Sequence, residues 1–154
     1  MAKQTIAVIG GGLMGAGIAQ TFAAAGHQVA VCEPFDEVRT SLIERVREGL
    51  VQVGDDPACA KNIVVTSDLA TAVQDASFVT EAVPEKLELK RSIFADLVAL
   101  APRDAVLASN SSVMPIGSMT QDLETAERIV GTHWWNPAVL IPLVEVIQGE
   151  RTSL

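Results

Sequence analysis

The chain has 154 residues and a mass of 16.3 kDa, enough for one domain with one hydrophobic core. A net charge of −8, with 49% hydrophobic and 19% charged residues, excludes a disordered chain and argues against nucleic acid or an anionic membrane as a partner. No apolar run approaches the roughly 20 residues that span a bilayer, and the N-terminus lacks a cleavable signal sequence. Cys32 and Cys59 match neither a disulfide framework nor a zinc site, so we expect a cytoplasmic protein without metal.

Short β-branched segments alternate with helical patterns along the chain. In chain order, the patterns predict a strand at Thr5–Ile9, a helix at 14–25, a strand at Gln28–Cys32, a helix at 36–53, a strand at Ile63–Thr66 and a helix at 68–75. They continue with a strand at Phe78–Glu81, a helix at 86–101, a strand at Ala105–Ser109, a helix at 115–122 and a strand at Ile129–Thr132.

Strands that are joined through helices predict a parallel sheet with helices on both faces. A last strand-like run, Leu140–Ile147, follows Thr132 too closely for a helical crossover, so we expect it to be antiparallel. The predicted fold class is α/β, a doubly wound and mostly parallel sheet with an antiparallel strand near the C-terminal end.

A glycine-rich loop follows the first predicted strand. Gly10, Gly12 and Gly15 occupy the three places of Gly-x-Gly-x-x-Gly, which allow a tight turn, the approach of a pyrophosphate, and close packing of the next helix. A flexible loop is the plainer alternative, but the strand before it and the helix after it favour a Rossmann-type dinucleotide site. We expect Leu13 and Met14 to belong to this cofactor site, beside the positive end of the helix.

Glu33 ends the second predicted strand, at the distance of about twenty residues that a ribose-binding acid usually has. A carboxylate there favours NAD over NADP because it repels a 2′-phosphate. Arg39 could favour NADP instead, but it falls inside the next predicted helix, and a solvated acid is the plainer alternative for Glu33. Flavin proteins share these features, but strand–helix units continue over the whole chain, which favours a complete NAD domain.

Four motifs follow in the second half: Glu81-Ala82-Val83-Pro84-Glu85-Lys86, Ser109-Asn110-Ser111-Ser112, His133-Trp134-Trp135-Asn136-Pro137 and Pro142-Leu143-Val144-Glu145. In their order and spacing, the chain resembles the N-terminal, NAD-binding domain of the 3-hydroxyacyl-CoA dehydrogenase superfamily. That superfamily also includes dehydrogenases of gulonate and carnitine, and a related lens crystallin. The resemblance covers essentially the whole chain.

The resemblance implies an NAD-dependent oxidoreductase, active on the 3-hydroxyl of an L-3-hydroxyacyl-CoA or a small 3-hydroxy acid, and a role in fatty acid metabolism. It also implies that a C-terminal helical domain follows residue 154 in the full-length protein, completes the substrate pocket and forms a homodimer. A non-catalytic NAD-binding or structural protein, like the crystallin, is the alternative.

His133 suits the exchange of a proton with a substrate hydroxyl, because a neutral imidazole is available near pH 7. Glu145, on the expected return strand, is placed to accept the other ring N–H and hold the ring. The resemblance assigns them the roles of acid/base and orienting partner, and adds Ser112 as a catalytic residue. Two unrelated polar residues and a serine-rich turn are the alternatives from the residues alone.

The resemblance further assigns cofactor contacts to Ala82, Glu85, Lys90, Asn110 and Asn136. Glu85 and Lys90 match positions at the cofactor ribose, Asn136 matches a contact with the nicotinamide amide, and Asn110 matches a position near substrate and cofactor. A solvated first helical turn is the alternative for Glu85 and Lys90, and a structural turn for Asn110.

Two further features depart from the acyl-CoA enzymes that the chain resembles. Trp134 and Trp135 replace two phenylalanines, and we expect one of them to pack in the core and the other to shape the pocket. The segment Glu37–Lys61 is shorter than the lysine-rich helical segment of those enzymes and carries mixed charges. It offers little positive field to a CoA phosphate, which favours a small carboxylated 3-hydroxy acid and leaves a CoA thioester open.

Overall fold

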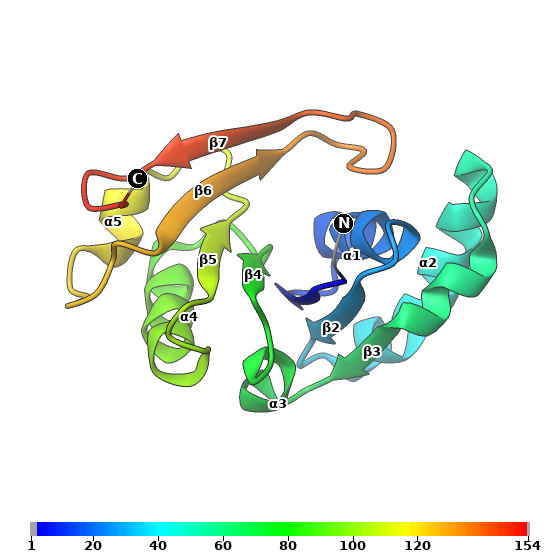
Figure 1. The fold of residues 1–154 in the computed structure, drawn as a ribbon, viewed down its shortest axis with the longest axis horizontal. Coiled ribbons are helices and arrows are strands. Elements are labelled where there is room, and N and C mark those ends of the chain that lie inside the picture. The colour runs from blue at the N-terminus through cyan, green and yellow to red at the C-terminus, as the bar shows by residue number, and fades with distance from the viewer. Residues whose placement is uncertain (1–2, 154) are drawn as a thin grey trace.

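The computed structural model describes residues 3–153 as one seven-stranded sheet with helices on its two faces (Figure 1). The strand order is β3-β2-β1-β4-β5-β6-β7. The strands are β1 (Thr5–Ile9), β2 (Gln28–Cys32), β3 (Ile63–Thr66), β4 (Phe78–Glu81), β5 (Val106–Ser109), β6 (Ile129–Trp134) and β7 (Val144–Gln148). The first six are parallel and β7 is antiparallel to β6, as the sequence predicts.

The helices divide between the two faces. They are α1 (Leu13–Ala24), α2 (Asp36–Val53), α3 (Leu69–Val73), α4 (Leu87–Leu100) and α5 (Ile116–Thr120). One buried cluster joins the sheet to α1 and α2 through residues such as Ile18 and Leu42. A second joins the other face to α3, α4 and α5 through residues such as Phe94 and Met119. Continuous apolar strands such as Ile6–Ile9 fit this arrangement, because both of their faces are buried.

The last strand differs from its sequence prediction. It begins at Val144 rather than at Leu140. Pro142 has no N–H to donate to a ladder, and the backbone before the strand turns instead, with Leu143 N–H donating to the carbonyl of Ile141 at 2.8 Å. The other boundaries agree to within about two residues, the usual uncertainty of helix and strand ends.

A short 3₁₀ helix, η1 (Pro57–Asn62), was not among the predicted elements. Asp56 caps it by accepting a hydrogen bond from the N–H of Ala58 at 2.8 Å, and Pro57 stands in its first turn. An N-capping acid followed by proline is a recognisable helix start, so the sequence carried a signal for this element.

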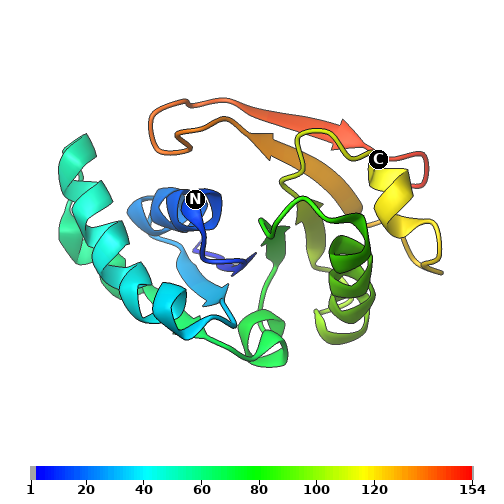
Figure 2. The same cartoon turned by 180° about the vertical axis from the view of Figure 1, so that it is seen from behind.

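In the described part of the chain, the helices leave most of β7 uncovered. Val146 is 70% exposed and Ile147 45% exposed. The connection from β6 to β7 reaches back across the sheet to α1 (Figures 1 and 2), where Ala138 joins the cluster of α1 and α2. Within residues 3–153, no helix has the length and apolar character needed to cross a membrane.

Candidate active site

The residues that the sequence singles out gather at the carboxyl edge of the sheet. Gly10 follows β1, Glu33 follows β2, Ala82 follows β4 and Asn110 follows β5, while His133 lies near the end of β6. Because parallel strands end at the same edge, segments far apart in the chain meet there. Main-chain hydrogen bonds join these segments. The N–H of Asn110 donates to the carbonyl oxygen of Glu81 at 2.8 Å, and the N–H of Ala82 donates to the carbonyl oxygen of Ile9 at 2.8 Å.

The three glycines of the loop have three different surroundings. Gly10 has φ +102°, and a Cβ there would lie 2.8 Å from the carbonyl oxygen of Ala82. A Cβ on Gly15 would lie 1.8 Å from the carbonyl oxygen of Gly10, so the helix packs directly on the turn. A Cβ on Gly12 would meet nothing within 4 Å. Bare backbone facing open space at Gly12 fits a dinucleotide pyrophosphate.

The N-terminus of α1 lies at the same place. Its N-cap residue Gly12 makes no side-chain capping bond, and the first turn has no acidic residue. Leu13 is 74% exposed and Met14 is half-buried. The N–H groups of this first turn are therefore available to an anion, and the helix dipole adds to their attraction.

Glu33 is buried rather than solvated, which overturns the plainer alternative for it. The side chain is 5% exposed. Its Oε2 accepts a hydrogen bond from the N–H of Gly11 and its Oε1 accepts one from the N–H of Phe35, both at 2.8 Å. Each carboxylate oxygen keeps a further acceptor site for a hydroxyl. The contact with Gly11 means that Glu33 also holds the glycine loop, a role that sequence reasoning missed.

Two arginines of α2 are tied to the same region. Arg39 Nη1 donates to the main-chain oxygens of Glu33 and Pro34, each at 3.1 Å, and its Nη2 pairs with Asp36. Arg45 Nη2 donates to the carbonyl oxygen of Gly11 at 2.7 Å. The pair of Arg39 with Asp36 has the i, i+3 spacing of a helical ion pair. The contact of Arg45 with Gly11 could not be read from the sequence, because it depends on how α2 packs beside the loop.

His133 and Glu145 face each other across the antiparallel pair of β6 and β7. The register places them directly opposite, and Nδ1 of the ring lies 2.6 Å from Oε2 of the carboxylate. With Glu145 accepting from Nδ1–H, Nε2 is the ring atom left to exchange a proton. The side chains are 20% and 48% exposed, respectively. The predicted pairing of the two residues is thus present in the structure.

The two tryptophans have different surroundings. Trp134 packs against the cluster of α1 and α2, with its ring centroid 5.6 Å from that of Phe22. Trp135 is 44% exposed and lies beside His133, with 5.5 Å between ring centroids. Asn110 holds this end of β6, because its Oδ1 accepts from the N–H of Trp134 at 3.0 Å. Asn136 is exposed in the connection that follows.

A buried ionic network lies beneath the ends of β4 and β5. Glu81 is 0% exposed and Lys90 is 1% exposed, and their Oε1 and Nζ atoms are 2.7 Å apart. Lys90 also lies 3.2 Å from Glu85, and the hydroxyl of Ser109 donates to Glu81 Oε2 at 2.7 Å. The solvated alternative for Lys90 is therefore wrong. Its ammonium lies between the carboxylates of Glu81 and Glu85, below the surface of the site.

Glu85 is the partly exposed member of this network. Burial disfavours its charged form, but the hydrogen bond from Ser111 and the nearby Lys90 ammonium outweigh that cost, so the pKa of Glu85 lies below its ordinary value. Ser111 also accepts from the N–H of Met114 at 3.0 Å. Its neighbour Ser112 is exposed. The Ser111 hydroxyl therefore stabilises the turn after β5, whereas Ser112 is exposed. The residues alone did not show which of the two serines stabilises the turn.

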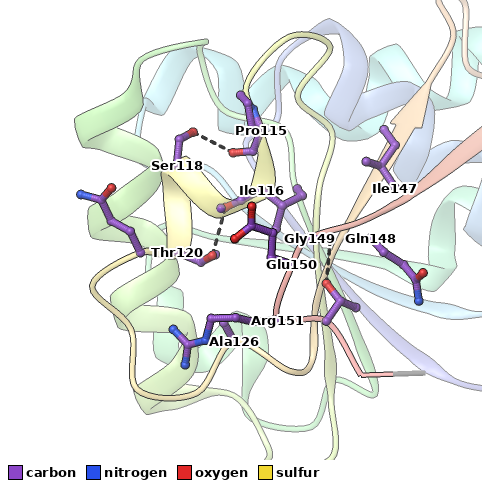
Figure 3. Close-up of a pocket in the computed structure, with 13 residues that line it drawn as sticks. Pro115, Ile116, Ser118, Thr120, Ala126, Ile147, Gln148, Gly149, Glu150 and Arg151 are labelled. Carbon is purple, nitrogen blue, oxygen red and sulfur yellow. Dashed lines mark hydrogen bonds between the residues drawn. The ribbon is translucent and has the colours of Figure 1, made fainter.

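A separate groove of about 440 Å³ lies between α5 and the segment that follows β7 (Figure 3). Hydrogen bonds shape its walls, including one from the Gly149 N–H to the Thr152 hydroxyl at 2.9 Å. Its lining includes neither His133 nor Glu145. Among residues 3–153, no group of three or more His, Cys, Asp or Glu side chains could hold a metal ion.

Comparison with known proteins agrees with this geometry. Residues 5–154 match the family described as 3-hydroxyacyl-CoA dehydrogenase, NAD binding domain. The chain is 35% identical to 3-hydroxyadipyl-CoA dehydrogenase of Escherichia coli (strain K12), covering 97% of this chain and 33% of the relative. It is 38% identical to L-carnitine dehydrogenase of Streptomyces coelicolor, covering 96% and 48%.

A solved structure of 3-hydroxybutyryl-CoA dehydrogenase from Escherichia coli K12 superposes with a TM-score of 0.90 at 34% identity, over 99% of this chain and 34% of that one. The chain thus spans about a third to a half of the length of these relatives. The match over residues 5–154 confirms the resemblance and the expected cofactor: the chain belongs to the family of NAD-binding domains of 3-hydroxyacyl-CoA dehydrogenases.

Proposed function

We propose that the whole protein is an NAD-dependent dehydrogenase that acts on the 3-hydroxyl of an L-3-hydroxyacyl-CoA or a small 3-hydroxy acid. The observation that carries the proposal is the His133–Glu145 pair, 2.6 Å apart at the edge of the sheet where the glycine loop lies. A protein that only binds NAD needs no such pair. The relatives reported above all carry the names of dehydrogenases, which also favours catalysis over a crystallin-like role.

The chain's own residues then divide the work. The bound cofactor would supply the hydride chemistry, NAD⁺ as the acceptor in the oxidation and NADH as the donor in the reduction. His133 takes the hydroxyl proton on Nε2 during oxidation and returns it during reduction. Glu145 holds Nδ1–H, keeps the ring in one tautomer and stabilises the imidazolium as the proton arrives. Ser112, exposed after β5, is proposed to meet the substrate oxygen.

The cofactor would lie along the carboxyl edge. The bare backbone at Gly12 and the first N–H groups of α1, from Leu13 and Met14, hold the pyrophosphate. Glu33 accepts from the adenine ribose, which gives a preference for NAD over NADP. Ala82 borders the turn at Gly10.

At the nicotinamide end, Glu85, Asn110 and Asn136 contact the cofactor. Lys90 is proposed to act through Glu85, which it holds from below at 3.2 Å. It thereby fixes the loop after β4.

The cations of α2 bear on the choice of substrate. Arg39 is paired with Asp36, Arg47 with Glu44 at 2.8 Å, and Arg45 is bound to the carbonyl of Gly11. Guanidinium groups with intramolecular partners attract a CoA phosphate less than free ones do. This supports a small carboxylated 3-hydroxy acid ahead of a CoA thioester.

Three further properties are proposed for the whole protein: an additional domain, a compartment and a metabolic role. We propose a C-terminal helical domain that completes the pocket and forms a homodimer, since the relatives are two to three times as long as the matched region. Free Cys32 and Cys59 favour a reducing, cytoplasmic compartment. A role in fatty acid metabolism applies if the substrate is an acyl-CoA.

One experiment tests the proposed function. The whole protein is assayed with NAD and 3-hydroxybutyryl-CoA, gulonate, carnitine and 3-hydroxybutyrate, beside its His133→Ala variant. We expect turnover of at least one substrate, and a loss of about a hundredfold or more in kcat in the variant, the usual contribution of general acid–base catalysis. NADH affinity should stay unchanged, because the ring faces the substrate. NADH binding without turnover of any 3-hydroxy compound would favour the non-catalytic alternative.

A further inference from the structure

Arg39 is the cation that could reverse the cofactor preference. It lies on α2, in the turn that follows Glu33 at the end of β2. An arginine in this region is the usual partner of the 2′-phosphate of NADP, and a guanidinium binds phosphate strongly. Its position therefore opposes the preference that Glu33 is proposed to set, unless its donors are already engaged.

The donors of Arg39 are engaged within the chain. Nη1 donates to the main-chain oxygens of Glu33 and Pro34, each at 3.1 Å, and Nη2 forms an ion pair with Asp36. The Arg39 side chain is 24% exposed. The two carbonyls carry no net charge, so Asp36, whose side chain is 80% exposed, is the charged partner of Arg39 among the described residues.

We infer that Asp36 is a specificity-determining residue: it keeps Arg39 paired within the chain, so that the guanidinium is not free to bind a 2′-phosphate. The inference rests on the proposed role of Glu33 at the ribose and extends it. A ribose with free hydroxyls does not need the guanidinium, so NADH binding should be indifferent to Asp36.

Glu37 provides a matched control. It follows Asp36 in the first turn of α2 and is exposed like it. Its carboxylate makes no contact with Arg39 in the part of the chain that the structure describes. Glu37→Ala therefore removes the same charge from the same turn without releasing the guanidinium.

The test measures dissociation constants for NADH and NADPH by fluorescence titration of the whole protein and four variants: Asp36→Ala, Glu37→Ala, Arg39→Ala, and the double variant Asp36→Ala with Arg39→Ala. We expect Asp36→Ala to tighten NADPH binding about tenfold, the value of one charge-assisted hydrogen bond. NADH binding should stay unchanged. The gain should shrink at high salt and disappear in the double variant. Arg39→Ala alone should leave NADPH binding weak.

The outcomes separate this inference from the proposal for Glu33. Equal affinities for NADH and NADPH in the unmodified protein would overturn both, because there would be no preference to explain. A preference for NADH, with equal effects of Asp36→Ala and Glu37→Ala, would overturn the role of Asp36 alone. A gain that persists in the double variant would also overturn it, and would point to Arg45, the other cation beside the loop.

Discussion

The two ends of the site hold a carboxylate in opposite ways. At the nucleotide end, Glu33 is 5% exposed and both of its oxygens accept backbone N–H groups. At the catalytic end, Glu145 is 48% exposed and is placed by the strand register opposite His133. The first carboxylate is part of the packing of the loop, whereas the second is held at an open edge of the sheet.

This difference predicts how the two ends respond to substitution. A change at the nucleotide end disturbs backbone packing, so it should affect folding as well as binding. A change at the catalytic end removes a half-exposed side chain from an edge strand, so it should affect turnover and leave stability intact. Substitutions at Gly15, Glu145 and Glu85 test how the parts of the site differ.

Gly15→Ala should destabilise the protein by about 3 kcal/mol, the upper part of the range for overpacking. The new Cβ would lie 1.8 Å from the carbonyl oxygen of Gly10, and both are backbone positions that cannot move independently. Chemical denaturation of the whole protein measures the loss.

Gly12→Ala is the matched control, since its Cβ would meet nothing within 4 Å. It should cost at most about 1 kcal/mol as a poorer N-cap, yet weaken NADH binding because the methyl group occupies the space assigned to the pyrophosphate. Equal destabilisation by the two variants would show that the loop is not packed as described.

Glu145→Gln should lower kcat by about 10- to 100-fold, the usual effect of removing an orienting partner. The amide oxygen can still accept from Nδ1–H, but the charge that stabilises the imidazolium is lost. Melting temperature and NADH affinity should not change. Glu150→Gln, an exposed carboxylate just beyond β7, serves as the control and should keep full activity. A fall in stability equal to the fall in kcat would contradict a role limited to catalysis.

Glu85→Gln should have the smallest effect, and the effect should depend on pH. The pKa of Glu85 lies below its ordinary value of 4.5, so its ionised form stabilises the fold above that pH and the benefit is lost as pH falls through the folded pKa. The difference in stability between the two proteins should be below about 1 kcal/mol at pH 7, since the side chain is 38% exposed.

Thermal melts between pH 7 and pH 3 measure this difference, which should vanish in acid. Glu124→Gln, in the loop before β6, is the control and should show a constant difference. A gap for Glu85→Gln that widens in acid would mean that the ionised form is not stabilised by Ser111 and Lys90.

The sequence by itself determined the order of the strands and helices along the chain, the glycine loop and the antiparallel return strand. These features rest on local patterns: apolar runs, glycine spacing, and a return strand too close to β6 for a helical crossover. The resemblance assigned His133 and Glu145 as partners, and the register of the antiparallel pair places them directly opposite each other.

Only the tertiary structure decided how the charged side chains are used. Lys90 falls on the same face of α4 as the buried Phe94 and Leu97, but only the fold shows that its ammonium pairs with Glu81 across the loop after β4. Asp36 and Arg39 have the i, i+3 spacing of a helical ion pair, but only the fold shows that Arg39 also donates to the carbonyls of Glu33 and Pro34. The burial of a charge depends on which partners the packing of distant segments brings within a few ångströms, and no local pattern encodes that distance.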